Sequence, residues 1–296
     1  MRDNIDINSN DNSLFVTSQC DNRCLMCSQP PLKMEDIEYH FRRNISIIQT
    51  IPADLTDIGI TGGEPTLLKE KLFDLIHLIK NRNPDILIHI LSNGRVFKNI
   101  DYVERLSDTG KENLLLGIPL HSDYSGDHDL ISRVKGSFEE TLMGLYNLDR
   151  YELDIELRIV INKINYKRLP KMASFIYRNL PFVKYISFMG MEYTGYAIKN
   201  RNLIWVDPVE YQNELEEVVI DLSTWGMNVS VFNLPHCLLK ETLYEYARKS
   251  ISDWKVTFLE SCNECLLKSD CCGLFSTSKK QSEHIVPVLD IKANYL

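Results

Sequence analysis

The chain has 296 residues, of which 44% are hydrophobic and 25% charged, the balance of an ordinary folded protein. This length allows one α/β barrel, alone or with a small added domain, and excludes more than two large domains. The formal net charge of -8 argues against a nucleic-acid-binding protein, because such proteins carry clustered Lys and Arg that neutralise phosphates.

The first dozen residues, MRDNIDINSNDN, are polar and lack the apolar core of a signal peptide, so we expect a disordered tail over residues 1–12. No stretch approaches the roughly 18 consecutive apolar residues that cross a bilayer. We therefore expect a cytoplasmic protein that does not bind a membrane. In that reducing compartment, eight cysteines gathered in two places favour metal ligation over disulfides.

Apolar, β-branched runs alternate with helix-like segments along most of the chain. Six strands are predicted, at SLFVT near residue 14 and in runs that end at Thr61, Asn93, Leu120, Asn162 and Glu192. Between them the sequence predicts helices over about 33–49, 67–80, 99–107, 137–149 and 168–178. This order is typical of a parallel sheet with helices outside, so we expect a partial or full βα barrel.

Two helix starts carry their own signals. Ser137 precedes an apolar run and has Glu140 three residues later, which predicts a capping box. Asp207, Pro208 and Glu210 indicate the same kind of start, with the Asp as N-cap and the Pro at the first helical position.

The fifth predicted strand alternates between apolar and largely polar residues. Glu156 and Arg158 fall on its polar face. If helices cover the apolar face, the polar face lines the barrel interior, which then encloses a wide, ligand-filled lumen rather than packed aliphatic side chains. The alternative is an edge strand with one solvated face. Alternation alone does not separate the two interpretations.

Three cysteines, Cys20, Cys24 and Cys27, follow the first predicted strand in CDNRCLMC. They lie at the carboxyl end of that strand, where α/β barrels place their chemistry. A structural zinc site needs four protein ligands, and the nearest histidine, His40, lies in a predicted helix. Iron–sulfur clusters normally take four cysteines, so three on a four-iron cluster would leave one iron open to an external ligand.

This spacing resembles the CxxxCxxC signature of the radical S-adenosylmethionine (radical SAM) superfamily. The resemblance implies that the three cysteines hold a [4Fe–4S] cluster whose free iron binds the amino and carboxylate groups of S-adenosylmethionine. It also implies that an electron from the cluster cleaves this cosubstrate to a 5′-deoxyadenosyl radical. Because short cysteine patterns recur in zinc sites, the alternative is a zinc knuckle.

Further motifs occur in the order that the family requires: GITGGEPTL, LSNGR and the arginine of the polar strand. The residues that the resemblance assigns to S-adenosylmethionine are Gly62, Gly63, Glu64 and Pro65 for its amino group, Ser92 and Asn93 for its ribose, and Arg158 for its carboxylate. Each has a structural alternative. Ser-Asn-Gly is an ordinary turn after a strand, and Arg158 could pair with Glu156 or Asp154 at the surface.

The segment GDHDLISRVKGSFEET resembles the region after the fourth strand in peptide-modifying relatives. We interpret His128 and Asp129 there as residues that position the loop and the following helix. We assign no substrate-side acid or base. Polar residues near the expected barrel mouth, namely Glu192, Tyr193, Tyr196 and Tyr124, are as often structural as catalytic.

A second cysteine group lies near the C-terminus. Its expected ligands are Cys237, Cys262, Cys265 and Cys271. Four thiols can complete a coordination shell, so we expect one auxiliary iron–sulfur cluster, with structural zinc as the alternative. The spacing resembles part of the SPASM and twitch extensions of radical SAM enzymes, and Phe275 stands where the full pattern has another cysteine. Cys272 is the spare thiol, although an exchange with its neighbour stays open.

Longer phrases, such as MGMEYTGYA and CNECLLKSDCCGLF, resemble the His-Xaa-Ser system radical SAM maturases of the HxsC type. That resemblance implies a partial (βα)6 barrel over 13–222 and a small C-terminal metal-cluster domain over 223–296. It implies that the enzyme modifies or crosslinks a ribosomally made peptide or small protein rich in His-Xaa-Ser repeats. The resemblance also implies a second partner, an electron donor such as a ferredoxin or flavodoxin.

Two other functions stay in view. The first is a radical SAM enzyme that acts on a small molecule in cofactor biosynthesis, as relatives with C-terminal cysteine groups do. The second is a non-catalytic binding module in which zinc stabilises both cysteine groups. Elemental analysis separates the second from the enzymes, and the response of the enzyme to candidate peptides separates the first.

Overall fold

The apolar runs of the sequence form parallel strands that pair in chain order, β1 to β8, into one curved sheet. The computed structural model describes residues 5–7, 9 and 11–290. The strands are β1 Ser13–Phe15, β2 Asp57–Thr61, β3 Leu87–Leu91, β4 Leu114–Pro119, β5 Asp154–Val160, β6 Tyr185–Met189, β7 Val229–Phe232 and β8 Ala247–Arg248. Because β1 and β8 are the two ends of this order, the sheet is a barrel that stays open between them.

All six predicted strands are present, and most end a few residues earlier than expected. The run predicted to reach Asn93, for example, leaves the sheet after Leu91. The strands β7 and β8 are additional. They lie beyond residue 222, so the sheet continues past the expected end of the barrel segment. Each has four residues or fewer, which is too short for alternation to give a clear signal.

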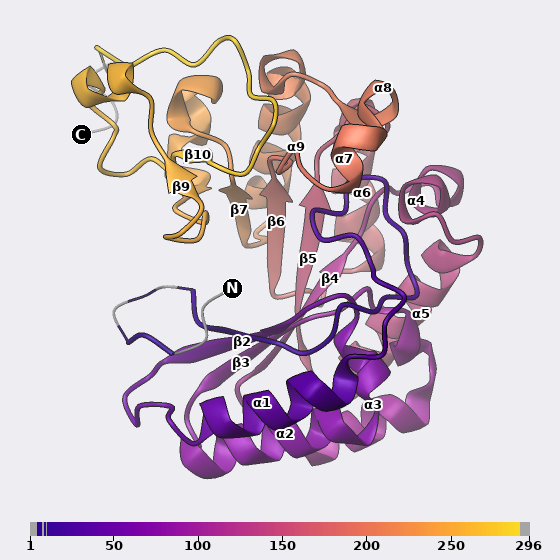
Figure 1. The fold of residues 1–296 in the computed structure, drawn as a ribbon. Coiled ribbons are helices and arrows are strands. Elements are labelled where there is room, and N and C mark those ends of the chain that lie inside the picture. The colour runs from indigo at the N-terminus through magenta and orange to yellow at the C-terminus, as the bar shows by residue number, and fades with distance from the viewer. Residues whose placement is uncertain (1–4, 8, 10, 291–296) are drawn as a thin grey trace.

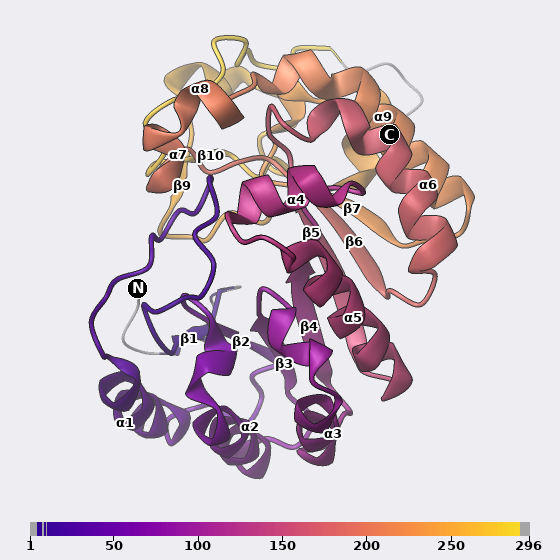
Figure 2. The same cartoon turned by 90° about the vertical axis from the view of Figure 1, so that its right-hand side faces the viewer.

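Helices connect the strands and cover one face of the sheet. Figure 2 shows α1, α2, α3, α5, α6 and α9 in an arc around the outer face of the curved strands. The helices are α1 Ile37–Ile48, α2 Glu70–Arg82, α3 Ile100–Asp108, α4 Ser125–Ser132, α5 Ser137–Arg150, α6 Leu169–Asn179, α7 Tyr196–Lys199, α8 Arg201–Ile204 and α9 Gln212–Thr224. The five predicted helical ranges correspond to α1, α2, α3, α5 and α6.

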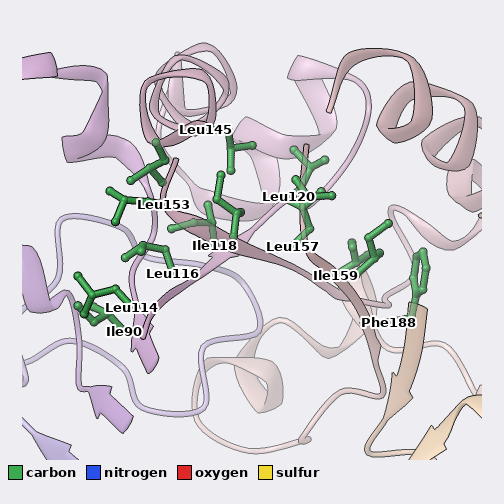
Figure 3. Packing of buried hydrophobic residues seen from close by; sticks show 14 of the residues in the cluster. Ile90, Leu114, Leu116, Ile118, Leu120, Leu145, Leu153, Leu157, Ile159 and Phe188 are labelled. Carbon is green, nitrogen blue, oxygen red and sulfur yellow. The ribbon is translucent and has the colours of Figure 1, made fainter. Parts of the chain in front are cut away.

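The hydrophobic core fills the space between the sheet and this outer layer. In Figure 3, Ile118 of β4 and Leu157 of β5 lie among the same apolar side chains as Leu145 of α5. All three are fully buried. Because successive side chains of a strand point to opposite faces, the residues between them on β4 and β5 face the barrel interior.

The start of α5 differs from the expected capping box. Gly136 occupies the N-cap position, and Ser137 is already the first helical residue. The cap comes from Asp129 of α4, whose carboxylate accepts hydrogen bonds from the backbone N–H of Gly136 at 2.5 Å and of Phe138 at 2.9 Å. Glu140 turns away and pairs with basic side chains instead. The positioning role expected for Asp129 is therefore confirmed, whereas capping by Ser137 was wrong.

The second predicted helix start is confirmed. Asp207 accepts a hydrogen bond from the backbone N–H of Val209, while the Glu210 side chain accepts one from the backbone N–H of Asp207. This capping box opens a 3-10 turn over Pro208–Tyr211, which runs directly into α9.

The C-terminal segment packs against the loop that follows β6. Its two short strands, β9 Val256–Thr257 and β10 Leu274–Phe275, pair antiparallel and lie at the end of the molecule away from α1–α3 (Figure 1). Glu192 forms an ion pair with Lys255 at 3.0 Å and accepts a hydrogen bond from Thr277 at 2.5 Å. None of the helices in the described part of the chain has the length and apolar composition that a membrane span requires.

Replacing Asp129 with Ala should lower the free energy of unfolding by about 1–2 kcal/mol, because the first turn of α5 loses its cap. Urea denaturation measures this change. The matched control is Glu139→Ala, an exposed carboxylate in the same helical turn, whose effect should be smaller. Equal losses in the two variants would contradict the capping role of Asp129.

Candidate active site

The carboxyl ends of the strands surround a cavity of about 620 Å³. Its wall includes the inward-facing residues of the central strands, among them Gly59 of β2, His89 of β3, Gly117 of β4 and Arg158 of β5. Since β5 lies between β4 and β6, it is not an edge strand. The polar face of β5 therefore lines a lumen, which was one of the two interpretations of its alternation.

The three cysteines of the first group lie on the loop after β1 and line this cavity together. The loop is held from α4, because the N–H of Arg23 donates to the carbonyl of Ser132 and that of Leu25 to the carbonyl of Ile131, at 3.1 and 2.8 Å. At the last of the three cysteines, the carbonyl of Cys27 accepts a hydrogen bond from the backbone N–H of Tyr196, which follows β6. Several elements thus fix the loop from outside the cavity.

Burial keeps these thiols protonated in the absence of a cation. It raises the pKa of Cys20 and of Cys24 to about 12, and it raises that of Cys27 as well. A bound metal reverses this preference, because it deprotonates a coordinating thiol. In the described residues, no three His, Cys, Asp or Glu side chains converge on a single-ion site.

The GGE loop after β2 lies directly against the cysteine loop. The backbone N–H of Gly63 donates to the carbonyl of Thr17 at 2.7 Å, and that of Glu64 donates to the carbonyl of Gln19 at 2.8 Å. A Cβ atom on Gly63 would lie 2.0 Å from the same Gln19 oxygen. Only glycine therefore permits this approach. Gly62 and Gly63 both line the cavity.

The Glu64 side chain points away from the cavity and is fully buried. Its carboxylate accepts hydrogen bonds from the Ser92 hydroxyl at 2.8 Å, from the backbone N–H of Asn93 at 2.7 Å and from Thr66. Burial raises the pKa of this carboxyl, and these hydrogen bonds oppose that rise. Glu64 thus joins the GGE loop to the loop after β3. Neither Glu64 nor the buried Pro65 is among the residues that line the cavity.

The loop after β3 brings Ser92 and Asn93 to the cavity wall. The Asn93 amide donates to the Asp21 carboxylate at 2.6 Å, which links this loop to the cysteine loop as well. The Ser92 hydroxyl, besides its bond to Glu64, accepts the backbone N–H of Gly94 at 3.1 Å. The structure therefore places five of the seven residues assigned to S-adenosylmethionine on the same cavity as the three cysteines.

The sequence analysis missed one polar residue of the lumen, His89, and its contact with Glu156. His89 sits within the apolar run of β3, and its Nε2 lies 2.9 Å from Oε2 of Glu156 on β5. Glu156 also accepts hydrogen bonds from the guanidinium of Arg158. The sequence contains one signal of this arrangement. His89 interrupts the apolar run ILIHIL, in which all the other residues are Ile or Leu.

The second cysteine group also gathers around one space. Cys237, Cys262, Cys265 and Cys271 line a narrow cavity between the segment after β7 and the C-terminal segment. Cys272 does not line it, because its side chain is buried and donates to the carbonyl of Gly273. Cys271, the predicted ligand of the two neighbours, is the one that lines the cavity.

Comparison with known protein families matches residues 14–176, more than half of the sequence, to the radical SAM superfamily. The chain belongs to that superfamily. It is a radical SAM enzyme, and membership implies a [4Fe–4S] cluster and S-adenosylmethionine. The finer resemblance to HxsC-type maturases is not decided by this match.

Relatives with known names act on different substrates. A GTP 3′,8-cyclase of Campylobacter jejuni subsp. doylei is 27% identical over 217 residues, which are 68% of this chain and 64% of that protein. A cysteine-type anaerobic sulfatase-maturating enzyme of Clostridium novyi is 24% identical over 186 residues, or 57% of this chain and 49% of that protein. The chain thus spans less than two thirds of either relative.

Among solved structures, Streptococcus suis SuiB bound to S-adenosylmethionine has a similar fold. The TM-score is 0.59 at 17% sequence identity, and the match covers 75% of this chain and 50% of SuiB. Identity this low supports the radical SAM fold alone.

Replacing Gly63 with Ala should lower the free energy of unfolding by about 1–3 kcal/mol, because the new methyl group overlaps backbone atoms of the cysteine loop. Thermal and urea unfolding measure the loss. The control is Gly126→Ala in α4, where the added Cβ meets the ring of Tyr124, an exposed side chain that can move. If both variants keep wild-type stability, the two loops are not packed as described.

Glu156 should make the stability of the protein sensitive to acid. Burial by itself raises the pKa of this carboxyl, but the close contact with the His89 imidazole and the charge on Arg158 outweigh it and lower the pKa from 4.5 to about 2. Such a group adds stability above its unfolded pKa and loses that contribution as the pH falls toward its folded pKa. From about pH 6 to about pH 3, the wild type should lose about 2 kcal/mol more than Glu156→Gln in urea unfolding.

Asp154→Asn is the matched control, because Asp154 lies on the same strand and forms an exposed pair with Lys184. Its stability should follow the wild-type dependence on pH. Identical curves for all three proteins would show that Glu156 is not held as an anion.

Proposed function

We propose that this radical SAM enzyme is a maturase that modifies or crosslinks a ribosomally synthesised peptide or small protein. The observation that carries the proposal is the extent of the cavity. It reaches from Cys20 to Asp57 at the amino end of β2, and to Trp254 of the C-terminal segment. It is lined by residues from β2 to β5 and from the segments before β1 and after β8, so it has room along the sheet for an extended chain.

The residues present fit the two groups that the superfamily implies. Cys20, Cys24 and Cys27 would hold the [4Fe–4S] cluster, and Gly62 and Gly63 would meet the amino group of S-adenosylmethionine through their backbone. The remaining residues proposed for the cosubstrate are Ser92 and Asn93 near its ribose, Arg158 at its carboxylate, and Glu64 and Pro65 as supports of the GGE loop. When bound, the pair supplies a 5′-deoxyadenosyl radical that abstracts hydrogen from the substrate.

The protein itself orients the substrate and limits access of water. The cavity wall combines backbone of the GGE loop, polar side chains of β3 and β5, and aromatic residues such as Trp254 and Phe275 from the C-terminal segment. Enclosure of this kind keeps a reactive intermediate from side reactions.

The C-terminal cysteines support one auxiliary iron–sulfur cluster. Cys237, Cys262, Cys265 and Cys271 share one cavity, and four thiols complete the coordination of a cluster without an open iron. We propose 13–222 as the main radical SAM segment and 223–296 as the SPASM/twitch-like segment. The cluster either accepts the electron that remains after bond formation or anchors this segment.

The finer proposal is an HxsC-type maturase whose substrate is rich in His-Xaa-Ser repeats and whose electron donor is a ferredoxin or flavodoxin. A structure of SuiB with a precursor peptide, SuiA, has the same fold, with a TM-score of 0.57 at 16% identity. The second candidate is a small-molecule substrate, which the similarity to the GTP cyclases favours. The extent of the cavity supports the peptide.

Metal analysis of anaerobically purified protein tests the cofactors. We expect iron and acid-labile sulfide, and we expect the triple change of Cys20, Cys24 and Cys27 to Ser to remove the iron of one cluster while that of the other stays. Cys272→Ser is the matched control and should keep all the iron. Zinc without iron or sulfide would overturn the enzyme proposal.

Turnover tests the substrate class. With S-adenosylmethionine and a reductant, the enzyme should form 5′-deoxyadenosine, and a synthetic peptide with His-Xaa-Ser repeats should stimulate this and gain a modification detected by mass spectrometry. Stimulation by GTP or a porphyrin in place of the peptide would support the small-molecule candidate.

A further inference from the structure

Arg158 is held at the cavity wall by a carboxylate of its own strand. Its Nη1 donates to both oxygens of Glu156, at 3.0 and 3.3 Å. Both side chains lie on the inward face of β5, and Arg158 is the one that lines the cavity. The guanidinium is therefore restrained through one nitrogen rather than left to rotate.

Glu156 is in turn contacted from the adjacent strand β6 and, across β4, from β3. The Ser187 hydroxyl of β6 donates to Oε1 at 2.5 Å, and Nε2 of His89 on β3 lies 2.9 Å from Oε2. Its side chain is only 7% exposed. A buried carboxylate with this many partners keeps one orientation, because rotation would leave charge without a hydrogen bond.

Gly117 on β4 makes the contact between β3 and β5 possible. An added Cβ at this position would lie 2.8 Å from Nε2 of His89 and 3.1 Å from Cδ of Arg158. A larger residue would thus occupy the space through which the imidazole reaches Glu156. The contact between His89 and Glu156 therefore requires a glycine at position 117.

The opposite edge of the guanidinium stays available. In the described residues, Nε and Nη2 of Arg158 have no hydrogen-bond partner, and neither atom is a buried unsatisfied group, so both face the cavity. These two donors form the parallel pair that a carboxylate accepts in a bidentate manner. Glu156 neutralises the charge of Arg158. A ligand carboxylate would therefore be bound through the geometry of the two N–H donors more than through net charge.

We propose that Glu156 is a positioning residue, which fixes Arg158 so that its Nε and Nη2 edge receives the carboxylate of S-adenosylmethionine. This inference rests on the proposed role of Arg158 in binding that cosubstrate. His89 and Ser187 act through Glu156 and hold its carboxylate. Glu156 and Ser187 are not among the residues that line the cavity, so both act on the cosubstrate only through Arg158.

Binding of two probes by the iron-loaded enzyme tests the inference. One probe is S-adenosylmethionine, and the other is decarboxylated S-adenosylmethionine, which keeps the sulfonium and amino groups but lacks the carboxylate. Dissociation constants are measured anaerobically by isothermal titration calorimetry. Glu156→Gln should weaken binding of the first probe about tenfold and leave binding of the second unchanged, because only the carboxylate uses the positioned edge.

Two variants give matched comparisons. Asp154→Asn makes the same chemical change two residues earlier on β5 and should bind both probes as the wild type does. Arg158→Lys keeps the charge but loses the two parallel N–H donors of the guanidinium. It should therefore weaken binding of S-adenosylmethionine at least as much as Glu156→Gln does. If Glu156→Gln does not fold, Ser187→Ala removes one hydrogen bond to the same carboxylate and should give a smaller loss, about threefold, again confined to the first probe.

Each outcome decides the inference. Equal losses for both probes would show that Glu156 supports the fold and not the carboxylate site, and unchanged or tighter binding of S-adenosylmethionine would also overturn the proposal. Failure of the wild-type, iron-loaded enzyme to bind either probe would instead overturn the proposed function. The two failures are therefore distinguishable.

Discussion

The buried carboxylate of Glu64 is the constraint on which the carboxyl end of the sheet depends. Its side chain bonds the loop after β3, and its backbone N–H bonds the loop that carries the three cysteines. Because the carboxyl ends of parallel strands meet at one edge, residues as distant in sequence as Cys20 and Asn93 reach the same cavity. Glu64 turns that general proximity into a fixed arrangement, at the cost of burying a carboxyl group.

The interior of the barrel follows a different rule from its outer layer. Outside, aliphatic side chains fill the space between strands and helices, as in other α/β proteins. Inside, Gly59 and Gly117 leave room, and the polar side chains of Glu156 and Arg158 hydrogen-bond one another. A closed barrel packs this volume with branched residues. Here the same volume forms the cavity, because these inward-facing residues are small or polar and leave space for a ligand.

Periodic segments of the sequence were sufficient to predict the first six strands, five of the helices and the cysteine loop. Short elements were not, since β7 and β8 contain too few residues for a period to appear. Capping by Asp129 was missed because the capping residue lies in the preceding helix, eight positions before Ser137. The bond network of Glu156 was missed for a related reason: its partners come from β3 and β6, and only the sheet register brings them together.

The loop over residues 190–199 contacts both cysteine-bearing parts of the chain. At one end, Glu192 and Tyr193 hold the C-terminal segment through Lys255 and the backbone N–H of Lys279, and at the other the N–H of Tyr196 donates to the carbonyl of Cys27 at 2.9 Å. These residues thus connect the C-terminal segment to the cysteine loop. Loosening of the C-terminal segment therefore weakens one support of the cysteine loop, while the hydrogen bonds of that loop to α4 and to the GGE loop stay in place.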